Sequence, residues 1–193
     1  MKKTISLLAV LMMVYCSNAQ NTSFGVKAGL NIASVEATGN DLEGKAGLYL
    51  GGLAHIHLNQ RWAFQPELVY SMQGGKDDDF TLKLDYVNIP LLLQYMTPEG
   101  LRLQTGPQIG FLVKAKQKVG DVEVDVKDEV ETTELAWTLG AGYLFPEGWG
   151  IDLRFNVGLT NVNEDDDYKL KNRVIQLGVF YQFMQQSRHR KRK

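Results

Sequence analysis

Residues 151–159 read IDLRFNVGL, and apolar side chains alternate with polar side chains or glycine through the whole segment. Successive side chains of a β-strand point to opposite faces, so a period of two indicates a strand. All five odd-numbered positions from Ile151 to Leu159 are apolar, whereas Asp152 and Arg154 fall on the other face. The segment therefore predicts a strand with one apolar face and one polar face.

Seven other segments repeat this pattern, so the chain predicts eight strands of about ten residues, the length that a membrane-spanning strand needs. The segments lie near residues 24–32, 48–58, 62–72, 87–95, 101–113, 135–145 and 175–183. Short turns alternate with longer polar loops, which we expect near residues 34–46, 74–84, 115–133 and 161–172. This layout is typical of outer membrane barrels. We expect an all-β fold, an eight-stranded antiparallel transmembrane β-barrel of up-and-down topology.

The glycine positions favour a membrane barrel over a soluble eight-stranded barrel, whose apolar face would point inward. Most strand glycines fall on the polar face, namely Gly25, Gly29, Gly47, Gly51, Gly106, Gly110, Gly140, Gly142, Gly158 and Gly178. An eight-stranded barrel is just wide enough to be filled by side chains, so small inward residues make room for long polar ones. Two aromatic belts are expected at the strand ends. The residues are Trp62, Tyr95, Tyr143, Phe145, Trp149, Tyr181 and Phe183 at one end, and Tyr70, Phe80, Trp137 and Tyr168 at the other.

The first 19 residues have the pattern of a cleaved secretory signal peptide, with two lysines, an apolar run over 5–15 and small residues before the expected cut. Cys16 offers an alternative, an acylated lipoprotein, but the bulky Tyr15 before it disfavours that processing. We expect three parts: residues 1–19 as the signal peptide, 20–183 as the outer-membrane β-barrel domain and 184–193 as a basic periplasmic tail.

The charge distribution separates an acidic body from this basic tail. The chain has 193 residues with 21 Lys and Arg against 22 Asp and Glu, a formal net charge of −1 that argues against nucleic-acid binding. Five of the last six residues are basic. Between the signal peptide and those residues, 14 basic and 22 acidic side chains leave a net charge of −8.

Several segments resemble the PorT-type family of outer-membrane β-barrels from Gram-negative bacteria. They are FGVKAGLN (24–31), YVNIPLLLQY (86–95), GPQIGFLV (106–113), DLRFNVGLTNV (152–162) and LGVFYQF (177–183). The resemblance covers essentially the whole chain after the signal and implies the same barrel fold. The namesake of the family is implicated in protein secretion. Family chains often end at the aromatic residue of the last strand, whereas this chain continues for ten residues beyond Phe183.

The polar faces of the strands supply a candidate network inside the barrel, formed by Lys27, Glu67, Arg102, Asp152 and Arg154. A buried charge without a partner is costly, so we expect these groups to be paired. Strands three and seven stand opposite each other in an eight-strand ring. Counting from the strand ends places Glu67 and Arg154 at similar height, with Asp152 and Arg102 as a lower pair. The pairing predicts a closed lumen.

The sequence offers few candidates for catalysis or for metal binding. His55 and His57 share one strand face, but no third ligand accompanies them, so we expect them to form ordinary hydrogen bonds. Acidic residues recur at 77–79, 121–134 and 164–167. Their oxygens suit divalent cations, yet no loop has EF-hand spacing. No nucleophile elbow or phosphate-binding loop occurs. We assign no catalytic, cofactor-binding or metal-binding residue.

Pro90 lies inside a predicted strand although it has no N–H group to donate. A closed barrel has no free edge at which such a loss is harmless. We therefore expect a local bulge or a missing ladder hydrogen bond at this position.

Three functions remain for a non-enzymatic barrel of this kind: a structural or surface-display protein of the envelope, an accessory component of a secretion or envelope-assembly complex, and a small-solute channel. The first is the prediction. We expect an integral outer-membrane protein with extracellular loops and periplasmic termini. Its expected partners are outer-membrane lipid and lipopolysaccharide, the barrel-assembly machinery during biogenesis and, in the second case, secretion-complex proteins.

Overall fold

A computed structural model describes residues 22–37, 43–76, 81–120, 122–127, 131–160 and 170–183. The predicted signal peptide (1–19) and the basic tail (184–193) lie outside the described residues. Phe80 and Tyr168, two members of the predicted aromatic belts, also lie outside them.

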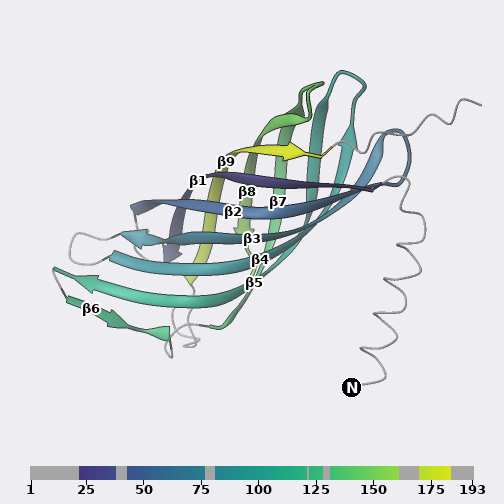
Figure 1. The fold of residues 1–193 in the computed structure, drawn as a ribbon. Helices are drawn as coiled ribbons and strands as arrows, with labels where there is room; N and C mark the ends of the chain where they lie inside the picture. Colours follow the sequence, from purple (N-terminus) through teal and green to yellow (C-terminus); the bar gives the residue numbers. More distant parts are fainter. Residues whose placement is uncertain are drawn as a thin grey trace, which may run out of the picture.

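Eight antiparallel strands close into a barrel, as the alternating pattern predicted (Figure 1). The strands are β1 (Thr22–Ala37), β2 (Glu43–His57), β3 (Trp62–Lys76), β4 (Thr81–Met96), β5 (Leu101–Val119), β7 (Thr133–Leu144), β8 (Trp149–Gly158) and β9 (Leu170–Gln182). Each strand pairs with its neighbours in chain order, and β9 closes the ring against β1 with Gly25 opposite Gln182. A ninth strand, β6 (Val122–Asp125), pairs with the end of β5 outside the ring.

The side chains are sorted as in a membrane barrel, with apolar residues outside and polar residues inside. Phe24, Leu50 and Leu177 are about 60% exposed on the outer face. The inner face buries polar and charged residues, among them Asn31, His55, Gln73, Asn88, Gln104, Gln108, Asn156 and Gln176. An outward apolar wall is what a closed sheet presents to lipid. Among the described residues, no helix is long and apolar enough to span a bilayer.

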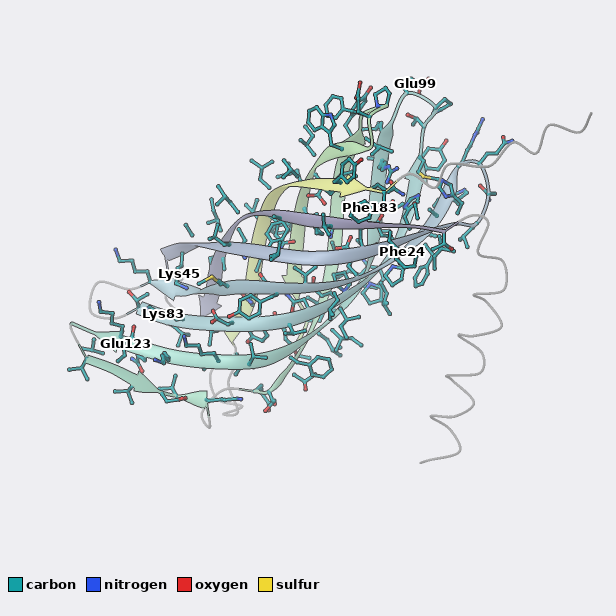
Figure 2. All side chains as sticks on the ribbon, in the orientation of Figure 1. Phe24, Lys45, Lys83, Glu99, Glu123 and Phe183 are labelled. Atoms are coloured by element: carbon teal, nitrogen blue, oxygen red, sulfur yellow. The ribbon has the colours of Figure 1, made fainter. Side chains whose placement is uncertain are left out.

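Short turns and aromatic pairs mark one end of the barrel, called here the short-turn end. The turns over 58–61, 97–100 and 145–148 lie there, as do the start of β1 and the end of β9. Figure 2 shows Glu99 and Phe183 at this end, opposite Lys45, Lys83 and Glu123. The belt rings pack in pairs: Trp62 with Tyr95, Tyr143 with Phe145, Phe145 with Trp149, and Tyr181 with Phe183.

At the opposite, long-loop end the strands run further than the sequence predicted. β1 has 16 residues, β4 has 16 and β5 has 19, so much of the expected loops at 34–46, 74–84 and 115–133 is strand. The prediction of ten-residue strands was wrong there, because it followed an apolar outward face. A strand that continues beyond the lipid into water keeps its backbone hydrogen bonds but no longer needs an apolar outward face. In Figure 1, β4, β5 and β6 form this projecting part.

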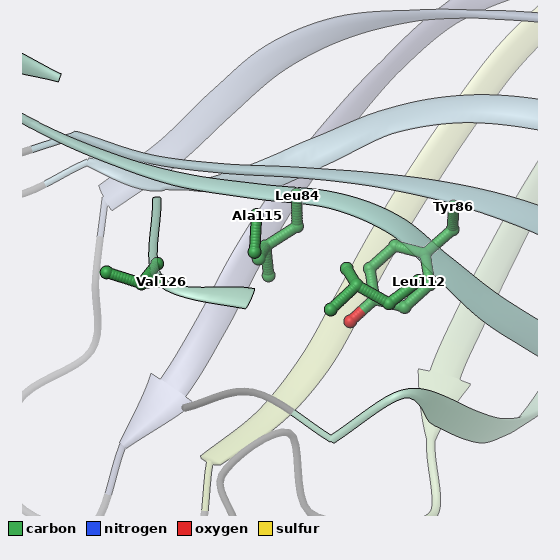
Figure 3. Close-up of a cluster of buried hydrophobic side chains, with 5 residues drawn as sticks. All are labelled: Leu84, Tyr86, Leu112, Ala115 and Val126. Carbon is green, nitrogen blue, oxygen red and sulfur yellow. The ribbon is translucent and has the colours of Figure 1, made fainter. Parts of the chain in front are cut away.

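At the long-loop end of β4 and β5, apolar side chains point inward and charged side chains point outward, the reverse of the arrangement in the rest of the barrel. A register shift between the two strands occurs at Asp85 and Tyr86. Around this shift, the inner face carries a buried apolar cluster of Leu84, Tyr86, Leu112, Ala115 and Val126 (Figure 3). The outer face of the same segment carries Lys83 and Lys116, which both contact Glu123 of β6. We call residues 81–85 and 114–119 together with β6 the strand extension.

Pro90 interrupts the ladder without bulging the strand. The β3–β4 pairing keeps one register from Pro66–Leu91 to Val69–Asn88, and the intervening pairs are missing. In the β4–β5 pair the bulge lies instead opposite Asp85 and Tyr86, where Val113 of β5 is skipped in the pairing. The loss of ladder pairing expected at Pro90 is therefore present, and the alternative of a bulge at Pro90 was wrong.

A candidate polar site in the barrel lumen

Four charged side chains form a closed set at the middle of the lumen, called here the lumen quartet: Lys27, Glu67, Asp152 and Arg154. Arg154 donates from Nη1 and Nη2 to the two carboxylate oxygens of Glu67, each at 2.7 Å. Lys27 Nζ lies 3.3 Å from Glu67 Oε2 and 3.0 Å from Asp152 Oδ2. Arg154 Nε lies 3.0 Å from Asp152 Oδ2. Two cations thus balance two anions.

Two glutamine side chains add hydrogen bonds to the quartet. Gln65 Nε2 donates to Glu67 Oε1 at 2.6 Å, and Arg154 Nη2 donates to Gln104 Oε1 at 3.1 Å. All four quartet residues are at least 96% buried. Bidentate pairing of a guanidinium with a carboxylate fixes orientation as well as charge. The arrangement is therefore a rigid crosslink between β1, β3 and β8 through the inside of the barrel.

Tyr49 of β2 joins this set because glycines leave room for its ring. Its hydroxyl donates to Asp152 Oδ1 at 3.3 Å, and its ring lies 5.4 Å from Lys27 Nζ. A Cβ atom at Gly178 would collide with the Tyr49 hydroxyl, and one at Gly29 would press on the ring. The inward glycines therefore accommodate one large side chain, as the sequence argument expected of them.

The predicted lower pair of Asp152 and Arg102 does not form. Asp152 lies against Lys27 and Arg154 instead. Arg102 donates from Nη2 to Gln182 Oε1 at 2.9 Å and lies 5.7 Å from the centre of the Phe180 ring. Lys27 and Arg154 lie closer to Asp152 and neutralise its charge. Counting positions along the strands could not predict this choice of partners. The structure thus brings four of the five predicted network residues together and places Arg102 apart from them.

The two histidines lie at the short-turn end of the lumen. Their rings meet edge to face with centroids 4.6 Å apart, and His55 Nδ1 is hydrogen-bonded to Gln65 Oε1 at 3.0 Å. His55 is fully buried, whereas His57 is exposed at the rim. In the described ranges, no three His, Cys, Asp or Glu side chains gather in a way that would hold a metal. The pair makes an edge-to-face ring contact, and His55 adds a hydrogen bond.

A cavity of about 10 Å³ lies beside the quartet, where Asp152 and Arg154 line it together with Gln65, Gln94 and Arg102. That volume has room for about one water molecule. Side chains therefore fill the lumen at this level.

A second polar network, which sequence reasoning missed, lies on the long-loop side of the quartet. Asn31 and Gln73 both donate to Ser71 Oγ, at 2.8 and 3.1 Å. Asn172 Nδ2 donates to Gln73 Oε1 and lies 3.4 Å from Glu134 Oε2. Glu134 had been counted with the acidic stretch 121–134. The sequence did hold a signal for Glu134. Leu135 and Trp137 are outward apolar residues of β7, so the alternation places Glu134 on the inward face.

The fold and the polar lumen define the class of protein, an outer-membrane β-barrel. The model of the family described as "Outer membrane protein beta-barrel domain" matches residues 18–164, so the chain belongs to that family. The narrower PorT-type resemblance stays a prediction. No curated protein matches the chain significantly.

Solved barrels share this fold at low sequence identity. Neisserial surface protein A (NspA) aligns with a TM-score of 0.63 and 16% identity, covering 85% of this chain and 100% of that one. Ail, the attachment invasion locus protein of Yersinia pestis, aligns with a TM-score of 0.57 and 17% identity over the same shares. A major outer membrane protein from Thermus thermophilus gives 0.50 and 15%, covering 84% of this chain and 99% of that one. These likenesses concern the fold alone.

Proposed function

We propose that this protein is a structural envelope protein, a barrel with a closed lumen that displays the strand extension outside the cell and performs no catalysis. The lumen quartet is the observation that carries the proposal. Its ion pairs of 2.7–3.3 Å cross the interior and leave the four charges neutral as a set. A solute moving along the axis would have to break buried ion pairs, which is costly.

The expected orientation places the long-loop end outside and both termini in the periplasm, after cleavage of residues 1–19. Short turns on the periplasmic side and longer outer segments are the usual arrangement of such barrels. The charged outer face of the strand extension, with Lys83, Lys116 and Glu123, would then lie at or above the outer leaflet. Lipopolysaccharide and outer-membrane lipid are the partners proposed for this face and for the apolar wall, and the barrel-assembly machinery for biogenesis.

Planar-bilayer recordings test the closed lumen. The refolded wild-type protein is expected to give no steady single-channel current, while a general porin in the same bilayer does. Its insertion is verified separately, by outer-membrane fractionation and by the gel-mobility difference between unboiled and boiled samples. Steady wild-type channels would replace the proposal with the small-solute channel. A stoichiometric partner in a pull-down of the folded barrel would favour the secretion-complex accessory.

A further inference from the structure

Glu134 is a buried carboxyl group that has no ion-pair partner within the described ranges. It lies at the start of β7 on the inner face, only 5% exposed. The ion pairs of the described residues include the quartet and the Lys83–Glu123–Lys116 set, and none of them involves Glu134. The quartet is neutral as a set, whereas an ionised Glu134 would have no cation partner among the described residues. Burying such a charge unpaired is strongly unfavourable.

Two buried amide side chains next to Glu134 have oxygen atoms without a hydrogen-bond donor. Asn172 is 1% exposed, its Nδ2 lies 3.4 Å from Glu134 Oε2, and its Oδ1 has no partner. Asn88 is also 1% exposed, and neither of its amide atoms has a partner. Buried polar atoms are almost always satisfied, so each of these amide oxygens is available to accept from a donor or to bind a cation.

Glycines bring these side chains together. Gly110 of β5 is in register with Asn88 of β4 on one side and with Glu134 on the other. A Cβ atom at Gly110 would lie 2.7 Å from Asn88 Oδ1 and 3.6 Å from Glu134 Cβ. On the far side, a Cβ at Gly158 would lie 3.2 Å from Glu134 Oε1 and against the backbone of Asn172. Glu134 therefore borders two positions that carry no side chain, one shared with the amide oxygen of Asn88 and the other with the backbone of Asn172.

We infer that Glu134, Asn172 and Asn88 form a binding site for a single calcium ion in the long-loop half of the lumen. One carboxylate and two amide carbonyls are hard oxygen ligands of the kind that calcium prefers, and water can complete its coordination shell. The ion supplies the positive charge that the quartet obtains from Lys27 and Arg154. Tyr86 and Leu112 of the apolar cluster lie next to this site, toward the long-loop end (Figure 3). The site goes beyond the proposed structural role and does not depend on it.

Equilibrium dialysis with radioactive calcium tests the site directly, on full-length mature protein refolded in a non-ionic detergent without lipopolysaccharide. Wild type is expected to bind one calcium ion per chain, and Glu134→Gln is expected to lose that binding. Glu131→Gln is the matched control, because it makes the same chemical change three residues away at an exposed position. It should bind as wild type does. Asn172→Asp adds a second carboxylate and should raise the calcium affinity, whereas a merely structural Asn172 would not produce that gain.

Thermal unfolding provides the second measurement, with calcium or with a chelator. Calcium should raise the unfolding temperature of wild type and Glu131→Gln and leave that of Glu134→Gln unchanged. Equal calcium binding by wild type and Glu134→Gln, or none by wild type at millimolar calcium, would overturn the inference. So would a wild-type unfolding temperature that depends on pH but not on calcium, because a proton on Glu134 would then be the counter-charge.

Discussion

Glu67 of β3 and Arg154 of β8 meet across the barrel in a bidentate ion pair, with both nitrogen–oxygen distances at 2.7 Å. Lys27 and Asp152 bind to the same pair from β1 and β8. The contact joins opposite walls of the ring without any backbone connection. Its strength depends on burial, since neither side chain of the Glu67–Arg154 pair is more than 3% exposed.

Replacing Glu67 by alanine should therefore destabilise the barrel strongly. Glu67→Ala leaves Lys27 and Arg154 buried with only Asp152 to neutralise them. Removing one partner of a buried ion pair costs about 3–5 kcal/mol. We expect a loss of that size in the free energy of unfolding, measured by urea titration of the protein in lipid vesicles.

A double-mutant cycle checks that the loss comes from this pair. Glu67→Ala combined with Arg154→Ala should cost clearly less than the sum of the two single changes, because each removes the same interaction. Glu99→Ala, in an exposed turn at the short-turn end, is the control and should change little. Additive effects in the cycle would show that Glu67 and Arg154 act independently.

Gly178 is predicted to be intolerant of any side chain because the Tyr49 ring occupies its space. Gly178→Ala should lower the unfolding free energy by about 1–3 kcal/mol, the usual cost of overpacking. Tyr49→Ala in the same chain should recover part of that loss, which urea titration would detect. Gly52→Ala is the control, since the nearest atom to its added Cβ would be 3.8 Å away. An equal loss in both alanine variants would contradict the Tyr49 explanation.

The alternation in sequence was enough to predict the closed eight-stranded barrel and the facing of its residues. Counting positions along opposite strands also placed Glu67 and Arg154 at the same height, and the structure has them in contact. The partner of Asp152 was mispredicted, because three cations lie on neighbouring inward positions and strand counting cannot rank their distances. Which of the three cations pairs with Asp152 depends on the shear of the barrel and on the side-chain conformations.

The strand extension was missed for a different physical reason. Its outer face carries lysines such as Lys83 and Lys116 where the rest of the barrel carries apolar residues. A search for strands with an apolar outward face therefore stops before this segment. Glu134 was missed because a run of acids normally indicates a solvated loop. However, β7 begins inside that run, at Thr133, and its alternation turns the side chain of Glu134 into the barrel.

The apolar cluster inside the strand extension should stabilise that part locally. Leu84 is fully buried there, with Ala115 and Val126. Leu84→Ala should expose residues 122–127 to limited proteolysis while the unboiled barrel keeps its folded gel mobility, because the cluster lies beyond the quartet. Leu50→Ala, a lipid-facing leucine that is 64% exposed, is the control and should leave proteolysis unchanged. Complete unfolding of the Leu84 variant would show that the extension and the barrel form one cooperative unit.

Glu123 should remain ionised down to strongly acidic pH. Hydrogen bonds from Lys83 and Lys116, with the charges of those two lysines, lower the pKa of its carboxyl group from 4.5 to about 2. A carboxyl with a lowered pKa contributes stability above its ordinary pKa and loses it as the pH falls through the lowered value. The contact should thus persist at neutral pH and disappear between about pH 4.5 and 2. Carbon-13 NMR of the Glu123 carboxyl in detergent micelles measures this titration. In a Lys83→Met, Lys116→Met double variant the pKa should rise toward 4.5. An unchanged pKa in that variant would show that the two lysines do not contact Glu123 as the structure has them.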